Sequence, residues 1–336
     1  MLGGQIRRRR VQRGLSQAQL AARAGVSRQL VGSVEAGRHL PRVDAAAQLA
    51  RALDTTVEAL LAPATEPVAS ATGNRLAPGA TVRVGRVGER LVAAPAAPAG
   101  ERWEPADAVV GEEGLELLPG ADPGTVILGC DPALGLVERL IVERGGPRVL
   151  AVAAPTATAV AALADRRAHA GLVHGPAERL PQPPVPVRRQ HLARWRVGLA
   201  APVERSGAWW QEALAGRARV AQREPEASSQ TALVGAVTRL GGTPPPGPRV
   251  AGHLEAAAAS AREGIVSVTI EPAATAAGLA FHPLEEHHAQ LWIAEEHADD
   301  AGLAALGEVL RSAGFRQRIA AIGGYDLTDV GQRITP

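Results

Sequence analysis

The chain has 336 residues, about twice the usual length of one domain, so two or three domains are expected. No apolar run approaches the ~20 residues of a membrane span and the N-terminus lacks the apolar stretch of a secretory signal, which predicts a soluble cytoplasmic protein. The single cysteine excludes an internal disulfide and a cysteine-cluster zinc site, and the lack of lysine excludes a Walker-type phosphate loop and a pyridoxal Schiff base.

Charge is divided unevenly along the chain, although the formal net charge is only +2. Residues 1–63 contain ten arginines against four acidic residues, a net charge of +6, and the remainder carries −4. A small basic head on a mildly acidic body predicts a nucleic-acid-binding module joined to a domain with another role.

Residues 1–63 predict a bundle of five short helices. Two of these, at 17–24 and 28–36, each follow a serine cap, Ser16 and Ser27, and are separated by a tight turn at Gly25. This is the helix-turn-helix arrangement, whose second helix can enter the major groove, although the spacing alone also fits a plain helical bundle. The other helices are expected at 1–13, 43–53 and 57–61.

The segments Leu15–Ala21, Gly25–Gln29 and Val34–Arg38 resemble the phage-repressor (XRE) helix-turn-helix family over residues 5–62. The resemblance implies a structural ion pair between Arg10 and Glu35, and a homodimer that binds a double-stranded DNA operator. Side-chain chemistry agrees with base reading, because arginine suits guanine and glutamine suits adenine. The candidates for DNA contact are Gln17, Ser27, Arg28, Gln29 and Ser33, with Arg9 and Arg13 as candidates for phosphate contacts.

Residues 64–120 predict a linker and a small β subdomain. The segment Ala62–Ala80 is rich in Ala, Pro, Thr and Gly, as linkers are. Apolar and polar residues then alternate from Thr81 to Val92, which predicts a hairpin, and a further strand is expected at 109–118.

Residues 121–331 predict a two-lobed α/β domain. Short apolar runs alternate with helical segments, which favours mostly parallel sheets covered on both faces. A proline-rich bridge at 181–186 separates two such blocks. Strands are expected at 125–129, 148–153, 170–174, 196–200, 219–222, 250–252, 265–270, 281–284 and 289–294, with helices between them and two more at 299–312 and 315–322.

Three stretches, Gly129–Leu134, Arg223–Pro225 and Leu310–Asp326, resemble the periplasmic-binding-protein-like domains attached to cytoplasmic regulators. The resemblance covers residues 120–330 and implies a ligand site between two lobes. The sequence departs from the pattern at Ser267 and Thr269, where an Asp and a Gly are expected, and this puts a standard ligand in doubt.

Ligands of open parallel sheets bind outside the carboxyl ends of strands, where helix N-termini offer free N–H groups. A hydroxyl in these loops either binds a ligand or caps its own helix. Asp131 favours an organic metabolite with an amine or hydroxyl over a molybdate-like oxyanion, and Arg223 suits a carboxylate or oxyanion unless it pairs with Glu224. The ligand candidates are Cys130, Asp131, Thr156, Ser206, Arg223, Ser228, Ser229 and His253.

The run Glu285–His288, with His282 before it, contains residue types that bind metal ions. Its spacing matches no helical zinc motif and Pro283 interrupts any helix there, so a solvated turn between strands is expected, with no metal and no cofactor. The sequence as a whole predicts a ligand-responsive transcriptional regulator that is not an enzyme. A constitutive DNA-binding scaffold with a ligand-free body, or an enzyme domain fused to a DNA anchor, stays open as the alternative.

Overall fold

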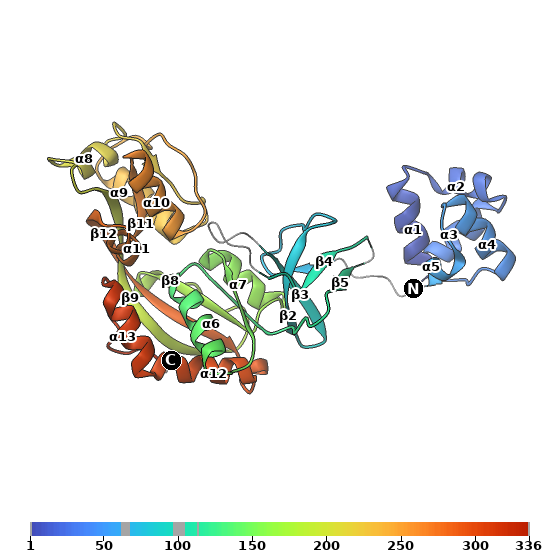
Figure 1. Ribbon diagram of the computed structural model, residues 1–336. Coiled ribbons are helices and arrows are strands. Elements are labelled where there is room, and N and C mark those ends of the chain that lie inside the picture. The colour runs from blue at the N-terminus through green and yellow to red at the C-terminus, as the bar shows by residue number, and fades with distance from the viewer. Residues whose placement is uncertain (1, 62–67, 97–104, 113, 335–336) are drawn as a thin grey trace. The chain divides into compact units, whose positions relative to one another are not determined.

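The computed structural model describes residues 2–61, 68–96, 105–112 and 114–334. The chain divides into two compact units, residues 1–67 and 68–336, and Figure 1 shows the elements of each. Among the described residues, no helix is both long enough and apolar enough to cross a membrane.

The first unit is a bundle of five helices around Ile6, Leu20 and Leu49, all fully buried. The helix ends follow the local signals: Ser16 forms a capping box with Gln19, and the Ser27 hydroxyl accepts from the Leu30 N–H. The predicted helices are confirmed to within two residues. They are α1 (Leu2–Gln12), α2 (Gln17–Ala24), α3 (Arg28–Glu35), α4 (Val43–Ala52) and α5 (Val57–Leu61).

A small five-stranded sheet opens the second unit, with strand order β1-β3-β2-β4-β5. Of the predicted linker 62–80, residues 62–67 lie outside the described residues and the rest includes β1. The sheet shares its apolar interior with the larger domain, because Val87 and Val92 pack against Val126. Gly85 lies so close to Val126 and Gly124 that a Cβ there would clash with both. The strands are β1 (Ala69–Ser70), β2 (Thr81–Val87), β3 (Arg90–Pro95), β4 (Ala108–Val110) and β5 (Leu115–Leu117).

The α/β domain that follows is built on a second, larger sheet. Its strands are β6 (Thr125–Gly129), β7 (Val149–Ala153), β8 (Ala170–Gly175), β9 (Val187–Pro202), β10 (Val220–Ala221), β11 (Val266–Ile270), β12 (Leu279–Ala294) and β13 (Arg333–Ile334). Its helices are α6 (Ala133–Glu143), α7 (Thr156–Ala164), α8 (Trp209–Leu214), α9 (Ser228–Arg239), α10 (His253–Glu263), α11 (Glu271–Ala276), α12 (Ala301–Arg311) and α13 (Ala313–Ile322).

The larger sheet is mixed, in the order β10-β11-β9-β12-β8-β6-β7, with β13 paired to β9. β6 runs parallel to β7 and β8, and β10 runs parallel to β11, as the strand–helix alternation predicts. The two long strands differ: β9 and β12 pair antiparallel over their whole length, and β12 is also antiparallel to β8. The expectation of mostly parallel sheets is therefore wrong at the centre of the domain.

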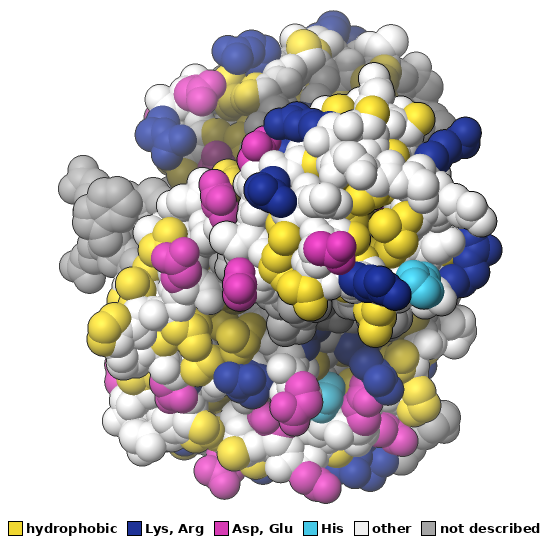
Figure 2. All heavy atoms as spheres, turned by 90° about the vertical axis from the view of Figure 1, so that its right-hand side faces the viewer, with side chains coloured by type: hydrophobic (Ala, Val, Ile, Leu, Met, Phe, Trp, Pro, Cys, Tyr) yellow, Lys and Arg dark blue, Asp and Glu magenta, His cyan; other side chains and the backbone are white. Residues whose placement is uncertain are grey.

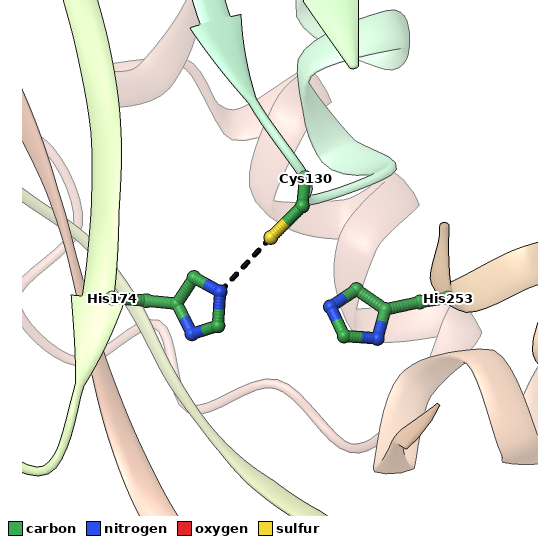
Figure 3. Close-up of side chains that lie close together, drawn as sticks. All are labelled: Cys130, His174 and His253. Atoms are coloured by element: carbon green, nitrogen blue, oxygen red, sulfur yellow. Dashed lines mark hydrogen bonds between the residues drawn. The ribbon is translucent and has the colours of Figure 1, made fainter. Parts of the chain in front are cut away.

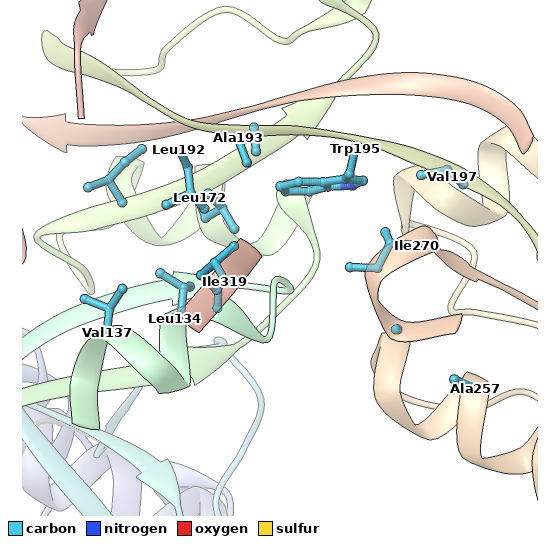
Figure 4. Packing of buried hydrophobic residues seen from close by; sticks show 14 of the residues in the cluster. Leu134, Val137, Leu172, Leu192, Ala193, Trp195, Val197, Ala257, Ile270 and Ile319 are labelled. Carbon is cyan, nitrogen blue, oxygen red and sulfur yellow. The ribbon is translucent and has the colours of Figure 1, made fainter. Parts of the chain in front are cut away.

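β9 and β12 pass through both lobes of the domain (Figure 1). Lobe one comprises β6, β7 and β8 with α6, α7, α12 and α13, and lobe two is the intervening segment 203–278. The proline-rich segment 181–186 precedes β9, so it is not the boundary between lobes. In lobe one, α6, α12 and α13 pack on one face of the sheet around Leu134, Leu172 and Ile319 (Figure 4), while α7 and the small sheet pack together with β6 and β7.

The solvated turn expected at Glu285–His288 is a second error. These residues lie inside the 16-residue strand β12, and the His287 side chain is fully buried. Pairing with β9 holds this polar segment extended, and a register shift between Pro283 and Glu285 accommodates the proline, which lacks an N–H for the ladder. The strand expected at 250–252 is instead a loop, ending at Gly252 with a φ of 80°.

Candidate functional site

The first candidate site is the exposed start of α3 in the helix-turn-helix bundle. Arg28 and Gln29 are exposed on its first turn, while Ser33 is half-buried one turn later. The Ser27 hydroxyl caps α3 by accepting from the Leu30 N–H. A shallow hollow at this surface is lined by Ser27, Gln29, Leu30, Ser33, Arg38 and His39, the last two of which the sequence reasoning did not select.

Gln17 is hydrogen-bonded to a mostly buried ion pair between Arg10 and Glu35. The Arg10 Nε–Glu35 Oε1 distance is 2.6 Å, which confirms the predicted pair, and the Gln17 amide donates to Glu35 Oε2 at 2.8 Å. Burial raises the pKa of Glu35, but the hydrogen bonds from Arg10 and Gln17 outweigh it and the net pKa is lowered. Gln17 is thereby positioned by α3, with its amide oxygen left over for another contact.

The two arginines selected for phosphate contact differ in exposure. Arg13 is exposed and its Nε lies 3.6 Å from Asp54 Oδ2, whereas Arg9 is half-buried. In the view of Figure 2, basic side chains lie among acidic and exposed apolar ones. An exposed pair such as Arg13–Asp54 is weak enough to exchange for a phosphate.

The second candidate site is a group of buried polar side chains in the α/β domain. Cys130 follows β6, His174 lies near the end of β8, and His253 is the first residue of α10. Cys130 Sγ lies 2.9 Å from His174 Nε2, and His253 Nε2 points toward the same space (Figure 3). The ligand-type atoms of all three lie within 4.8 Å of one another.

A chain of hydrogen bonds continues from His174 away from the thiol. His174 Nδ1 lies 2.9 Å from His287 Nδ1, and His287 Nε2 lies 2.7 Å from Glu285 Oε1. Glu285 also pairs with Arg179 at the surface. The carboxylate only accepts, so His287 donates from Nε2, His174 donates from Nδ1, and His174 Nε2 accepts from the Cys130 thiol.

His253 has the opposite tautomer. Its Nδ1 lies 2.9 Å from Nη1 of the buried Arg223, which also donates to Glu224. A guanidinium can only donate, so His253 Nδ1 accepts and Nε2 carries the proton. A protonated nitrogen cannot bind a metal ion, and the contact between Cys130 and His174 has the length of a hydrogen bond. The arrangement is that of a hydrogen-bond network, and the residues as placed do not fit a three-ligand metal shell.

Asp131 lies next to the thiol with one oxygen engaged. Its Oδ1 accepts from the Ala133 N–H at 2.6 Å and from the Tyr325 hydroxyl at 2.9 Å, while Oδ2 is buried without a partner. Burial raises the pKa of Asp131 to about 6, so the carboxylate is ionised at neutral pH. It can therefore accept a hydrogen bond from a ligand.

The hydroxyls selected from the sequence divide into three groups. Thr156 and Ser228 do not cap their helices: Thr156 Oγ1 accepts from the His174 N–H and Ser228 Oγ donates to the His174 carbonyl. The second contact joins the lobes, since α9 belongs to lobe two. Ser229 is buried and its hydroxyl has no partner. Ser206 is exposed in the loop after β9.

Three buried polar atoms without partners belong to this group: Asp131 Oδ2, His253 Nε2, and Nε1 of Trp195, which lies on β9. Each costs about 1–3 kcal/mol unless something fills its hydrogen-bonding capacity. Ser267 Oγ on β11 is also buried without a partner, while Thr269, the other departure from the family pattern, donates to the His253 carbonyl.

A family described as PBP superfamily domain matches residues 139–311, just over half of the chain. The chain belongs to the PBP superfamily. A family described as Helix-turn-helix matches residues 6–60, so the first unit is a helix-turn-helix domain of the phage-repressor (XRE) type. No curated protein matches the sequence.

Solved structures resemble each unit separately. The restriction-modification controller protein C.AhdI from Aeromonas hydrophila is 37% identical over 18% of this chain and 89% of that one, with a TM-score of 0.17. The regulatory domain of CcmR from Synechocystis in complex with 2-PG is 10% identical over 59% and 94%, with a TM-score of 0.41. An ABC-type phosphate transport receptor from Vibrio cholerae is 10% identical over 60% and 99%, with a TM-score of 0.42.

The PBP-superfamily domain contains polar residues that sequence reasoning missed, chiefly His174, His287, Glu285, Trp195 and Tyr325. A signal existed for the first: His174 stands near the end of a buried strand, as Cys130 does. None existed for His287 and Glu285, because only the register of β12 against β8 and β9 brings them to the site. Burial lowers the pKa of His174 to about 3 and that of His253 well below its usual value, so both rings are neutral.

Proposed function

We propose that the chain is a transcriptional regulator whose PBP-superfamily domain binds a small polar organic molecule and thereby alters operator affinity. The observation that carries the proposal is the set of unpartnered buried polar atoms drawn from both lobes, in a chain whose other unit is a helix-turn-helix domain. Such atoms are costly in an empty protein and are satisfied by a ligand held between lobes.

The hydrogen-bonding capacity of these atoms supports an organic ligand. His253 Nε2 and Trp195 Nε1 are donors, and Asp131 Oδ2 is an ionised acceptor. The ligand therefore carries at least one acceptor atom and one N–H or O–H group. A molybdate-like oxyanion is less well matched, because its charge would lie against the Asp131 carboxylate.

Ligand binding changes DNA affinity only if the ligand prefers one arrangement of the dimer over another. Such a ligand would strengthen or displace the inter-lobe hydrogen bond from the Ser228 hydroxyl to the His174 carbonyl. In the other unit, the exposed Arg28 and Gln29 are the proposed base-reading residues, and binding as a homodimer would place two such helices on one operator.

The test uses the full chain in two steps. A thermal-shift screen against a metabolite panel, with molybdate, tungstate and sulfate, should yield an organic compound that raises Tm by several degrees, since a ligand at a hundred times its Kd adds about 2.7 kcal/mol. The hit is then added to a binding assay on an operator selected from random DNA, where a change of about 5- to 150-fold in affinity is expected.

Two outcomes would contradict this proposal. Tight binding of the compound with unchanged operator affinity would support a constitutive scaffold. Conversion of the compound into a product would support the alternative of an enzyme domain fused to a DNA anchor.

A further inference from the structure

The Cys130 thiol lies within a network of buried histidines, and noncovalent binding of a ligand needs no thiol there. It lies at one end of the hydrogen-bonded series Cys130–His174–His287–Glu285, hereafter the relay, and faces the unpartnered His253 Nε2. We propose that Cys130 is a nucleophile that captures a carbonyl-bearing ligand covalently and reversibly, its proton leaving through the relay. The inference rests on the proposed function in placing the ligand between the lobes.

The relay solves an electrostatic problem. A thiolate beside an imidazolium is unfavourable here, because burial raises the pKa of Cys130 to about 12 and lowers that of His174 to about 3. Along the relay, His174 Nε2 takes the thiol proton while its Nδ1 proton passes to His287 Nδ1. The His287 Nε2 proton then passes to Glu285. Both rings end neutral, and one negative charge has moved from Glu285 to the sulfur.

The net effect of the surroundings is to raise the pKa of the Cys130 thiol, because burial and the Asp131 and Glu224 carboxylates oppose a thiolate. The guanidinium of the buried Arg223 lowers the pKa of Cys130 against the effect of burial. Glu285, at the other end, is ionised at rest, because hydrogen bonds from His287 and Arg179 outweigh burial and lower its pKa. At rest the relay holds its proton on the thiol, and transfer to the ionised Glu285 is uphill, so the thiolate forms only as the sulfur attacks its electrophile.

His253 identifies the class of electrophile. Its Nε2 carries a proton, is buried, has no partner and points toward Cys130 (Figure 3). A donor in this position suits an oxygen that becomes negative as the sulfur attacks its carbon. The sulfur–carbon bond forms as the carbonyl π bond breaks. The oxygen then receives the proton that left the thiol, returned by the relay, giving a hemithioacetal with no oxidant or reductant consumed.

Alkylation of the full chain by iodoacetamide tests the nucleophile, and because the chain has one cysteine any thiol adduct in its intact mass is at Cys130. The sulfur bonds to the methylene carbon, iodide leaves, and the thiol proton goes to Glu285. We expect Glu285→Gln to slow labelling by about 100-fold, because an amide still accepts from His287 but cannot take up a proton.

The matched control is Glu286→Gln, which changes the neighbouring exposed carboxylate on the same strand, outside the relay. It should label at the wild-type rate, and a thermal melt should show that both variants are folded at the labelling temperature. Labelling of the wild type no faster than that of the urea-unfolded chain would overturn the proposal. Equal labelling rates for the wild type and Glu285→Gln would show that the relay does not carry the thiol proton.

A second arm tests the class of ligand with a matched pair of probes. Glycolaldehyde should protect Cys130 from iodoacetamide, with protection lost on dilution, whereas ethylene glycol of nearly the same size should not protect. Equal protection by both probes, or by neither, would overturn carbonyl capture. None of these measurements involves DNA, so a failure here leaves the proposed regulation standing, and the absence of a DNA response would leave the labelling result standing.

Discussion

The helix-turn-helix unit and the PBP-superfamily domain differ in the exposure and hydrogen bonding of their proposed binding residues. In the first, Arg10 and Gln17 both donate to Glu35, and Arg28 and Gln29, the residues proposed to read bases, are exposed. In the second, the residues proposed to meet a ligand are buried and several are left unsatisfied. A surface that binds a large partner is hydrated until the partner arrives, whereas buried polar groups without protein partners need a molecule bound beside them.

The largest effect is expected where the first unit does bury charge. Arg10→Ala leaves the Glu35 carboxylate, whose side chain is 4% exposed, without its cation, and should destabilise the bundle by about 3 kcal/mol. Amide hydrogen exchange in α1–α5 of the full chain measures this locally. Arg13→Ala removes an exposed pair and should change exchange by less than about 0.5 kcal/mol. Similar losses in the two variants would show that burial does not distinguish these pairs.

The next effect tests the buried carboxylate of the second unit. The pKa of Asp131 is raised from 3.8 to about 6, so the folded state binds its proton more tightly than the unfolded chain does. Wild-type stability should therefore fall by up to about 3 kcal/mol as the pH rises from about 4 to about 6. Asp131→Asn should lack this fall, and histidine contributions cancel when the two proteins are compared by urea unfolding at each pH. A pH-independent difference would mean that Asp131 is not held in a raised-pKa environment.

A smaller effect is expected at the DNA surface. Arg28→Ala should reduce the preference for operator over random DNA by about 1–3 kcal/mol, because a bidentate contact to guanine is lost. Fold should not change, since the side chain is exposed. The exposed Arg51 on α4 is the control, and Arg51→Ala should retain the preference. A wild-type ratio of specific to random binding in Arg28→Ala, measured at fixed salt, would rule out base reading by this residue.

The smallest effects have opposite signs. Ser229→Ala removes an unpartnered buried hydroxyl and should stabilise the ligand-free domain by about 1 kcal/mol, or about 2 °C in Tm, while weakening ligand binding. Ser260 is equally buried, but its hydroxyl donates to the Ile265 carbonyl at 2.7 Å, so Ser260→Ala should destabilise by about 1 kcal/mol. Calorimetry of both variants sharpens the comparison, and destabilisation by Ser229→Ala would show that its hydroxyl is satisfied.

The sequence predicts best what is decided locally. The helix ends at Ser16, Gly25 and Ser27 follow from side-chain caps and a left-handed glycine, and the strands at 125–129 and 170–174 contain short apolar runs at 126–128 and 170–173. Both kinds of signal lie within a few residues of the feature that they predict.

The long strands escaped prediction because their stability comes from distant pairing. Glu285–His288 contains no apolar residue and follows a proline, so its local pattern indicates a turn. Ala289 is placed opposite both His174 and Ala193, and this register brings His287 toward His174, 113 positions earlier in the chain. The strand-to-helix junctions that carry Cys130 and His253 were accessible to sequence reasoning, whereas the relay from Cys130 to Glu285 was not.

The antiparallel pairing of β9 with β12 also has a consequence for how the chain folds. The ladder starts at Leu279 opposite Pro202 and ends at Ala294 opposite Val187, so the two strands form a hairpin whose turn is the whole of lobe two. Closing so long a loop is slow for a disordered chain, because the entropy lost grows with loop length. If segment 203–278 folds first, it brings Pro202 and Leu279 together and the ladder can zip outward from there. The kinetic role of lobe two would then be to nucleate the strands that complete lobe one.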